Sequence, residues 1–325
     1  MSAFVMLAAL SASLGSAGAA SSMHVGRLQP APAPAWFTRS IADRVLSEGS
    51  VALPAAAQGS INTSSVAFLG IRPGQLIILD DGKTTSLCTA NFVFYTGSAP
   101  PAGLVTATSS KSAVSTKKPS SGTARVKGGG STASSYYIGT AGHCGKAGTQ
   151  VDMVFLPAGI AHIGQIVKST GDPGDRIGAT DFALISIDPS FNQYVSPSMA
   201  YWGGPTGVYT PPSNDAIAPV LHAGWGLVIG TGGTPRAGLA YKWNAGSEYR
   251  FEGAVTPGDS GSGAIVAGGL AAGNITHIAV DTRQSVPVWN GGTTMAAILQ
   301  YLGTSYHLAT CPTAIPWPLP GCPPV

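Results

Sequence analysis

Three short motifs in this sequence carry side chains that together can perform acyl transfer. The motif YYIGTAGHCG contains His143 just after a strand-like run, GATDFALISID starts an apolar run at Asp181, and PGDSGSG places Ser260 among glycines. A serine hydroxyl is a weak nucleophile until a neutral imidazole takes its proton, and a buried carboxylate holds that imidazole in the required tautomer. The chain order therefore predicts Ser260 as a nucleophile, His143 as its base and Asp181 as the residue that orients the base.

The glycines around Ser260 predict a second part of the same chemistry. An acyl-transfer intermediate carries an oxyanion, and backbone N–H groups that point to one spot stabilise it. A chain that turns tightly around Asp259 needs glycine where φ is positive or where another backbone comes close. We therefore expect the N–H groups of Gly258 and Ser260 to form an oxyanion hole.

Short strands are the elements that must position these residues. From about residue 66 the apolar runs are short and bounded by Gly, Pro, Asp or Ser, which is typical of a barrel or a sandwich. Only 10% of the residues are charged and 44 are glycine, so long exposed helices are not expected. Helix is predicted around residues 40–46 and near TTMAAILQYL at 293–302.

The motifs TAGHC, DFALI and GDSGSG resemble the catalytic blocks of the chymotrypsin/trypsin-like serine proteases, in the form that bacteria secrete. The resemblance covers about residues 66–300. It implies an all-β fold of two antiparallel six-stranded β-barrels with the active site in the cleft between them, to which we add the short C-terminal helix. It also implies a secreted serine endopeptidase with the catalytic triad His143, Asp181 and Ser260.

The four cysteines fit an exported chain with two disulfides, and three pairings are formally open. The simplest pairing is Cys88–Cys144 with Cys311–Cys322. The resemblance supports the first bridge, because the family has a disulfide behind the catalytic histidine. No cysteine or histidine spacing fits a zinc site and the aspartates near residues 172–181 lack the spacing of a calcium loop, so no metal or other cofactor is expected.

Substrate specificity is the least determined property. Ala254, six residues before Ser260, corresponds to the base of the specificity pocket and carries no charge. Asp281 and Thr282 are further candidates for this pocket. Glu252 or Asp281 projecting into it would favour Lys or Arg side chains, yet we expect an uncharged or mixed preference.

The buried aspartate expected at position 259 needs a positively charged partner. No IVGG-like start follows a basic residue, so a newly cleaved N-terminal amine is not expected to be that partner. His222 and Arg236 are the candidates within the chain.

The N-terminus is typical of an export signal, with an apolar core from Ala3 to Leu14 and an A-x-A site at 17–19, although it lacks a positively charged start. The formal net charge of +3 and the absence of a binding motif argue against a nucleic-acid partner, and the basic stretch 98–134 is interpreted as a solvated insertion. We expect a secreted monomer that acts on protein or peptide substrates without stable membrane insertion. The expected division is a signal peptide at 1–20, a linker or short pro-segment at 21–65, a protease domain at 66–310 with barrels at about 66–190 and 215–300, and a disulfide tail at 311–325.

Two other functions must be weighed. An esterase of the α/β-hydrolase type would have a G-x-S-x-G elbow, the chain order serine, aspartate, histidine, and helices between the strands. The sequence fits none of these three features. An inert protease-like binding module would normally have lost a member of the triad, and here none is lost.

Overall fold

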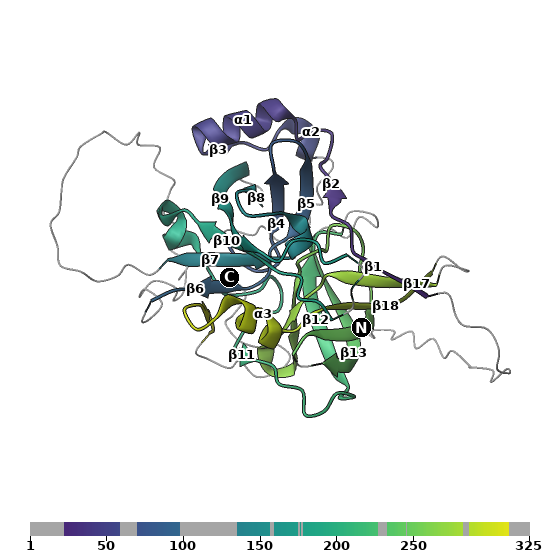
Figure 1. Cartoon of the computed structure of the whole chain (residues 1–325). Coiled ribbons are helices and arrows are strands. Elements are labelled where there is room, and N and C mark those ends of the chain that lie inside the picture. Colours follow the sequence, from purple (N-terminus) through teal and green to yellow (C-terminus); the bar gives the residue numbers. More distant parts are fainter. Residues whose placement is uncertain are drawn as a thin grey trace, which may run out of the picture.

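The computed structural model describes residues 23–58, 70–97, 135–156, 159–174, 176, 178–226, 233–244, 246–281 and 286–311. Two antiparallel sheets dominate it, and they lie against each other (Figure 1). The predicted all-β architecture of two barrels is confirmed.

The first sheet forms the first barrel. Its main strands are β4 (Leu76–Asp80), β5 (Thr85–Thr89), β6 (Val93–Tyr95), β7 (Tyr136–Thr140), β8 (Gln150–Phe155), β9 (Gly159–Ser169) and β10 (Ala183–Ile187). They pair in the order β6-β7-β10-β9-β8-β4-β5. Because β5 and β6 continue each other through residues 90–92, they act as one bent strand and bring the two ends of the sheet together. Counted in this way, the described part of the chain gives the six strands that were predicted.

The second barrel repeats this arrangement. Its main strands are β12 (Ala218–Gly224), β13 (Thr234–Asn244), β14 (Glu248–Gly253), β15 (Gly263–Val266), β16 (Leu270–Asn274), β17 (His277–Asp281) and β18 (Val286–Thr293). The order is β17-β18-β14-β13-β12-β15-β16. Here β16 and β17 are the bent strand, joined by residues 275–276, so the described residues again give six strands.

Shorter elements complete the two sheets and the connections. These are β1 (Met23–Arg27), β2 (Ala31–Pro32), β3 (Ser50–Val51), β11 (Gly207–Val208), β19 (His307–Leu308), and the 3-10 helices η1 (Gly142–Cys144), η2 (Pro189–Tyr194) and η3 (Ala267–Gly269). The α-helices are α1 (Arg39–Glu48), α2 (Ala55–Gln58) and α3 (Met295–Leu302). The last is the predicted C-terminal helix, and α1 covers the other stretch for which helix was predicted. No helix in the described ranges is long and apolar enough to cross a membrane.

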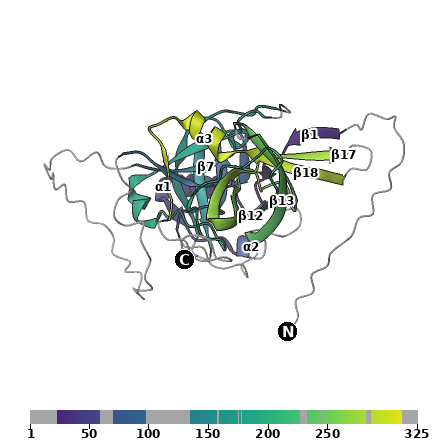
Figure 2. The same cartoon turned by 90° about the horizontal axis from the view of Figure 1, so that it is seen from below.

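The segment 23–58 lies along both barrels. Its strand β1 pairs with β17 of the second barrel, while β2 and β3 pair with β5 and β9 of the first. Both views show β1 running beside β17 (Figures 1 and 2). Trp36, Val45 and Leu53 pack in one apolar cluster with Leu76 and Ile160 of the first barrel. The predicted domain boundaries at residues 20, 65 and 310 stay predictions.

Apolar side chains fill each barrel and the space between them. Ile77, Ile138 and Ile185 belong to the core of the first barrel, and Trp243 and Phe251 to that of the second. A third cluster joins β10, β15 and α3 through residues that include Leu184, Ile265 and Ile298, so it fixes the two barrels and the C-terminal helix to one another.

The disulfide predicted between Cys88 and Cys144 is present and connects β5 to η1. Cys311 is buried, but Cys322 lies outside the described residues, so the second bridge stays a prediction.

We expect the double substitution Cys88→Ala with Cys144→Ala to lower the free energy of unfolding by about 4 kcal/mol. The reason is that the bridge joins residues 56 positions apart. Closing a loop of that length lowers the entropy of the unfolded chain and so raises its free energy by about this amount. Urea unfolding followed by circular dichroism measures the difference. A loss well below 1 kcal/mol would contradict the prediction.

Candidate active site

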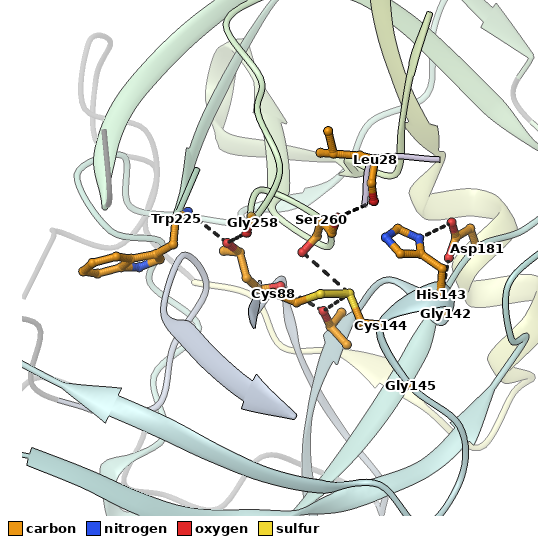
Figure 3. Close-up of a disulfide and its surroundings, with 12 residues drawn as sticks. Leu28, Cys88, Gly142, His143, Cys144, Gly145, Asp181, Trp225, Gly258 and Ser260 are labelled. Atoms are coloured by element: carbon orange, nitrogen blue, oxygen red, sulfur yellow. Dashed lines mark hydrogen bonds and ion pairs between the residues drawn. A yellow bond between two sulfur atoms is a disulfide. The ribbon is translucent and has the colours of Figure 1, made fainter. Parts of the chain in front are cut away.

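The two barrels contribute different members of the predicted triad. His143 lies on η1 just after β7, and Asp181 lies just before β10, so both belong to the first barrel. Ser260 lies on the turn between β14 and β15 of the second barrel. Figure 3 shows the ring of His143 between Asp181 and Ser260. The three residues therefore meet where the barrels face each other.

His143 and Asp181 form a closely bonded pair. The Nδ1 atom of His143 lies 2.7 Å from Oδ2 of Asp181, and the backbone N–H of His143 donates to Oδ1 at 3.0 Å. The backbone of Asp181 is itself fixed, because its N–H donates to Thr293 Oγ1 and its carbonyl accepts from Asn274 Nδ2, both at 3.0 Å. A carboxylate beside Nδ1 holds the proton there, which leaves Nε2 free to act as a base.

Asp181 remains ionised although it is fully buried. Burial raises the pKa of this carboxyl, but the charge of His143, the hydrogen bonds from His143 and the charge of Arg27 together hold the pKa below its usual value. The Arg27 Nε atom lies 3.6 Å from Asp181 Oδ2, the same oxygen that faces the imidazole. Arg27 is thus a cation next to Asp181 that the sequence did not indicate.

Ser260 does not bond to His143 in this structure. Its side chain is fully buried, and Oγ donates to the carbonyl oxygen of Leu28 at 2.7 Å. The Nε2 atom of His143 has no hydrogen-bond partner among the described residues. Figure 3 shows the carbonyl of Leu28 and the ring of His143 both facing Ser260. Ser260 therefore lies beside the His143–Asp181 pair, with its proton directed to a peptide carbonyl of the same chain.

The turn around Ser260 needs glycine for steric reasons. Gly258 has a φ of +101°, and a Cβ atom on it would lie 2.4 Å from the carbonyl oxygen of Trp225. Gly261 has a φ of +88°, and a Cβ atom there would lie 2.3 Å from Thr140 Oγ1. The N–H groups of Gly258 and Ser260 donate to no acceptor in the described part of the chain. Two donors thus stand unused beside the serine hydroxyl.

Arg236 bonds to Asp259 from within the second barrel. Its two terminal nitrogens donate to the two carboxylate oxygens of Asp259, and both side chains are buried. The N–H groups of Gly226 and Thr256 complete the carboxylate's hydrogen bonds at 2.8 and 2.9 Å. His222 faces Arg236 across the β12–β13 pair, but in the described part of the chain it does not bond to Asp259.

The candidate specificity residues are less fully described. Ala254 follows β14 and is exposed, as is Glu252. Asp281 is the last residue of β17, but its side chain is not described, and Thr282 lies outside the described residues. The expected uncharged preference therefore stays a prediction. No group of three or more metal-ligating side chains occurs within the described ranges.

Sequence reasoning missed Arg27 and Leu28, because it assigned residues 21–65 to a linker or short pro-segment without contacts to the site. The sequence MHVGRL contains a short strand, but its contacts with the site depend on the backbone of Leu28 and on the distant strand β17. No local motif signals such contacts. Thr293 and Asn274 were missed for the same reason, since they support Asp181 through its backbone.

No family model matches the sequence, and no curated protein matches it. Among solved structures, the chain is similar to protease A from Thermobifida fusca, at 17% identity and a TM-score of 0.44 over 74% of this chain and 98% of that one. It is also similar to a serine endoprotease from Yersinia pestis, at 14% identity and a TM-score of 0.40 over 71% of this chain and 61% of that one. A third similar structure is the protease Anisep from Arthrobacter nicotinovorans, at 13% identity and a TM-score of 0.38 over 70% of this chain and 92% of that one. These neighbours are bacterial chymotrypsin-like serine proteases, the family that the motifs resemble.

We expect Arg236→Gln to lower the free energy of unfolding by about 3–5 kcal/mol, because it leaves Asp259 as a buried charge without a cation. Lys242→Gln on the same strand is the matched control. The ion pair of Lys242 with Asp215 is exposed, so its loss should cost less than about 1 kcal/mol. Chemical denaturation of the two variants measures both values, and equal losses would contradict this prediction.

Stability should also fall in acid because His222 is buried in its neutral form. Burial and the charge of Arg236 lower the pKa of His222 to about 4, below its usual value of 6.5. The unfolded chain therefore binds the proton first, and stability that is complete above pH 6.5 is lost as the pH falls from there toward 4. The loss from this residue is about 3 kcal/mol.

Unfolding of the wild type and of His222→Gln across this pH range tests the expectation. As the pH falls through this range, the free energy of unfolding of the variant should decrease by about 3 kcal/mol less than that of the wild type. The control is His307→Gln, which removes an exposed histidine and should follow the wild-type curve. Parallel curves for the wild type and His222→Gln would refute the assignment.

Proposed function

We propose that this protein is a secreted serine endopeptidase that hydrolyses peptide bonds through an acyl-enzyme on Ser260. The observation that carries the proposal is the His143–Asp181 pair, 2.7 Å between Nδ1 and Oδ2, next to a serine on a glycine turn with two unused N–H donors. The disulfide supports export, because such bonds persist in oxidising compartments.

Each residue has a defined part in this reaction. His143 Nε2 takes the proton of Ser260 as Oγ attacks the carbonyl carbon of the substrate, and Asp181 stabilises the imidazolium that forms. The N–H groups of Gly258 and Ser260 bind the oxyanion, where one such donor typically contributes about 3 kcal/mol. His143 then gives its proton to the leaving amine, and a water molecule hydrolyses the ester by the same steps in reverse.

The proposal extends to the organisation and partners of the chain. Residues 1–20 would be the export signal and 66–310 the protease domain, acting as a monomer on protein or peptide substrates without a cofactor. The esterase alternative has no support in an architecture of two antiparallel barrels. The inert binding module is the alternative that experiment must exclude.

Labelling with a fluorophosphonate probe tests the proposal. We expect the full chain to react at Ser260 and to hydrolyse casein, and Ser260→Ala to lose both activities. Ser262→Ala is the matched control, because Ser262 is equally buried and its hydroxyl has no hydrogen-bond partner among the described residues. It should keep both activities.

The segment that covers Ser260 calls for one more variant, Leu28→Lys, in which a buried cation weakens the contact of Leu28 with the second barrel. If neither the folded full chain nor folded Leu28→Lys were labelled at Ser260, the endopeptidase assignment would be wrong.

A further inference from the structure

The segment that ends at Leu28 lies along the second barrel in the manner of a bound peptide. Its strand β1 pairs antiparallel with β17, from Met23 opposite Asp281 to Arg27 opposite His277. The N–H of Leu28 continues this pairing by donating to the carbonyl oxygen of Thr276 at 2.9 Å. Addition of an extended strand to an exposed sheet edge is a general mode of peptide recognition, in which main-chain hydrogen bonds give affinity. The segment therefore occupies a peptide-binding edge that leads to Ser260.

The chain then passes directly over the nucleophile. The carbonyl oxygen of Leu28 lies 2.7 Å from Ser260 Oγ, so the peptide bond between Leu28 and Gln29 is the one beside the hydroxyl (Figure 3). The unused N–H groups of Gly258 and Ser260 lie on the same turn as the hydroxyl, and the ring of His143, whose Nε2 atom is unpartnered, also faces the serine. The nucleophile of the proposed reaction thus contacts this bond directly, and its base and its N–H donors lie on the neighbouring elements.

The side chains on either side of this bond lie in different environments. Leu28 is 1% exposed and belongs to the apolar cluster of the second barrel that includes Val255, Ile275 and Phe251. The apolar surroundings on the amino-terminal side therefore accept an unbranched or γ-branched aliphatic side chain of this size.

The carboxyl-terminal side of the bond is open. Gln29 is exposed, and Gln29 and Pro30 line a hollow of about 380 Å³ next to His143 and Gly142. The residues directly after the bond therefore line a solvent-accessible space. Leu28 before the bond is thus buried in an apolar contact, whereas Gln29 after it is exposed to solvent.

We propose that the Leu28–Gln29 bond is the first substrate of Ser260 and that it is cut within the same molecule. This inference rests on the proposed endopeptidase function and assigns a processing site to it. Ser260 Oγ gives its proton to His143 and bonds to the carbonyl carbon of Leu28. The C–N bond to Gln29 then breaks, and the new amine of Gln29 takes the proton from His143. A water molecule hydrolyses the Leu28 ester, which releases residues up to Leu28 as a carboxylate and restores the serine.

The surroundings of Leu28 also indicate which residue the site prefers before the cut bond. The surroundings of Leu28 in the second barrel are apolar, so a leucine-like residue before the cut bond is favoured over a charged one. Until the bond is cut, β1 occupies the edge of β17 on which any other peptide would have to pair. Cleavage of this bond would therefore open the edge of β17 to external substrates.

The test follows the N-terminus of purified full-length protein by mass spectrometry and, in parallel, the hydrolysis of an external leucine-containing peptide. The wild type should yield a chain that begins at Gln29, at a first-order rate that does not change on dilution. Ser260→Ala should stay intact, also when it is mixed with wild type. Leu28→Lys should cut this bond at least about tenfold more slowly, while its hydrolysis of the external peptide equals or exceeds that of the wild type. That split excludes misfolding as the cause.

Leu46→Lys is the matched control, because Leu46 on α1 is 40% exposed and lies outside the site, so it should be processed at the wild-type rate. A wild type that hydrolyses the external peptide but keeps the Leu28–Gln29 bond, or is cut elsewhere, would overturn the processing site and leave the endopeptidase function standing. Cleavage of Ser260→Ala by added wild type at the same rate would overturn cleavage within one molecule. Absence of external hydrolysis in both the wild type and folded Leu28→Lys would overturn the endopeptidase function itself.

Discussion

Thr89 connects the nucleophile turn of the second barrel to the first barrel. Its N–H donates to the carbonyl oxygen of Ser260 and its Oγ1 donates to the carbonyl oxygen of Gly258, both at 2.8 Å. The same Oγ1 accepts the N–H of Trp225 at 3.0 Å. The neighbouring residue, Cys88, is bridged to the 3-10 helix that carries the histidine. One short strand end therefore sets the position of both Ser260 and His143, and the mutual geometry of the barrels depends on it.

Asp259 and Asp181 are both buried, and the arginines that pair with them come from different parts of the chain. Asp259 is paired with Arg236, which comes from a central strand of the same barrel, so this pair persists as long as the barrel is folded. Asp181 faces Arg27, which comes from the N-terminal segment and reaches the same oxygen that binds the imidazole. Removal of that segment would leave the oxygen to His143 alone. The structure thus separates a cation that stabilises the fold from one that shares a carboxylate oxygen with His143.

The two barrels and the first disulfide could be predicted from the sequence, and the residues of the proposed triad could be singled out, because each has a local signature. Short apolar runs between turn residues indicate strands, and TAGHC, DFALI and GDSGSG are compact motifs whose chemistry limits their interpretation. The choice between His222 and Arg236 could not be made in this way. Both lie on adjacent strands, directly opposite each other, and only the packing directs the guanidinium to Asp259. The contact of Leu28 with the serine was even less accessible, because a backbone carbonyl is present at every residue and its position depends on a pairing across more than 240 residues.

The tethering of the N-terminal segment determines how the site responds to other peptides. While the Leu28–Gln29 bond is intact, β1 is held close to β17 by the rest of the chain, where β2 pairs with the first barrel only a few residues later. A ligand tethered by a short linker acts at an effective concentration of about millimolar, so dilute external peptides do not displace it. After the proposed cleavage the same strand would be an ordinary ligand that is lost on dilution. In the proposed reaction, the proton of Ser260, now directed to the carbonyl of Leu28, would then be free to turn to His143, and the site would be open to other peptides.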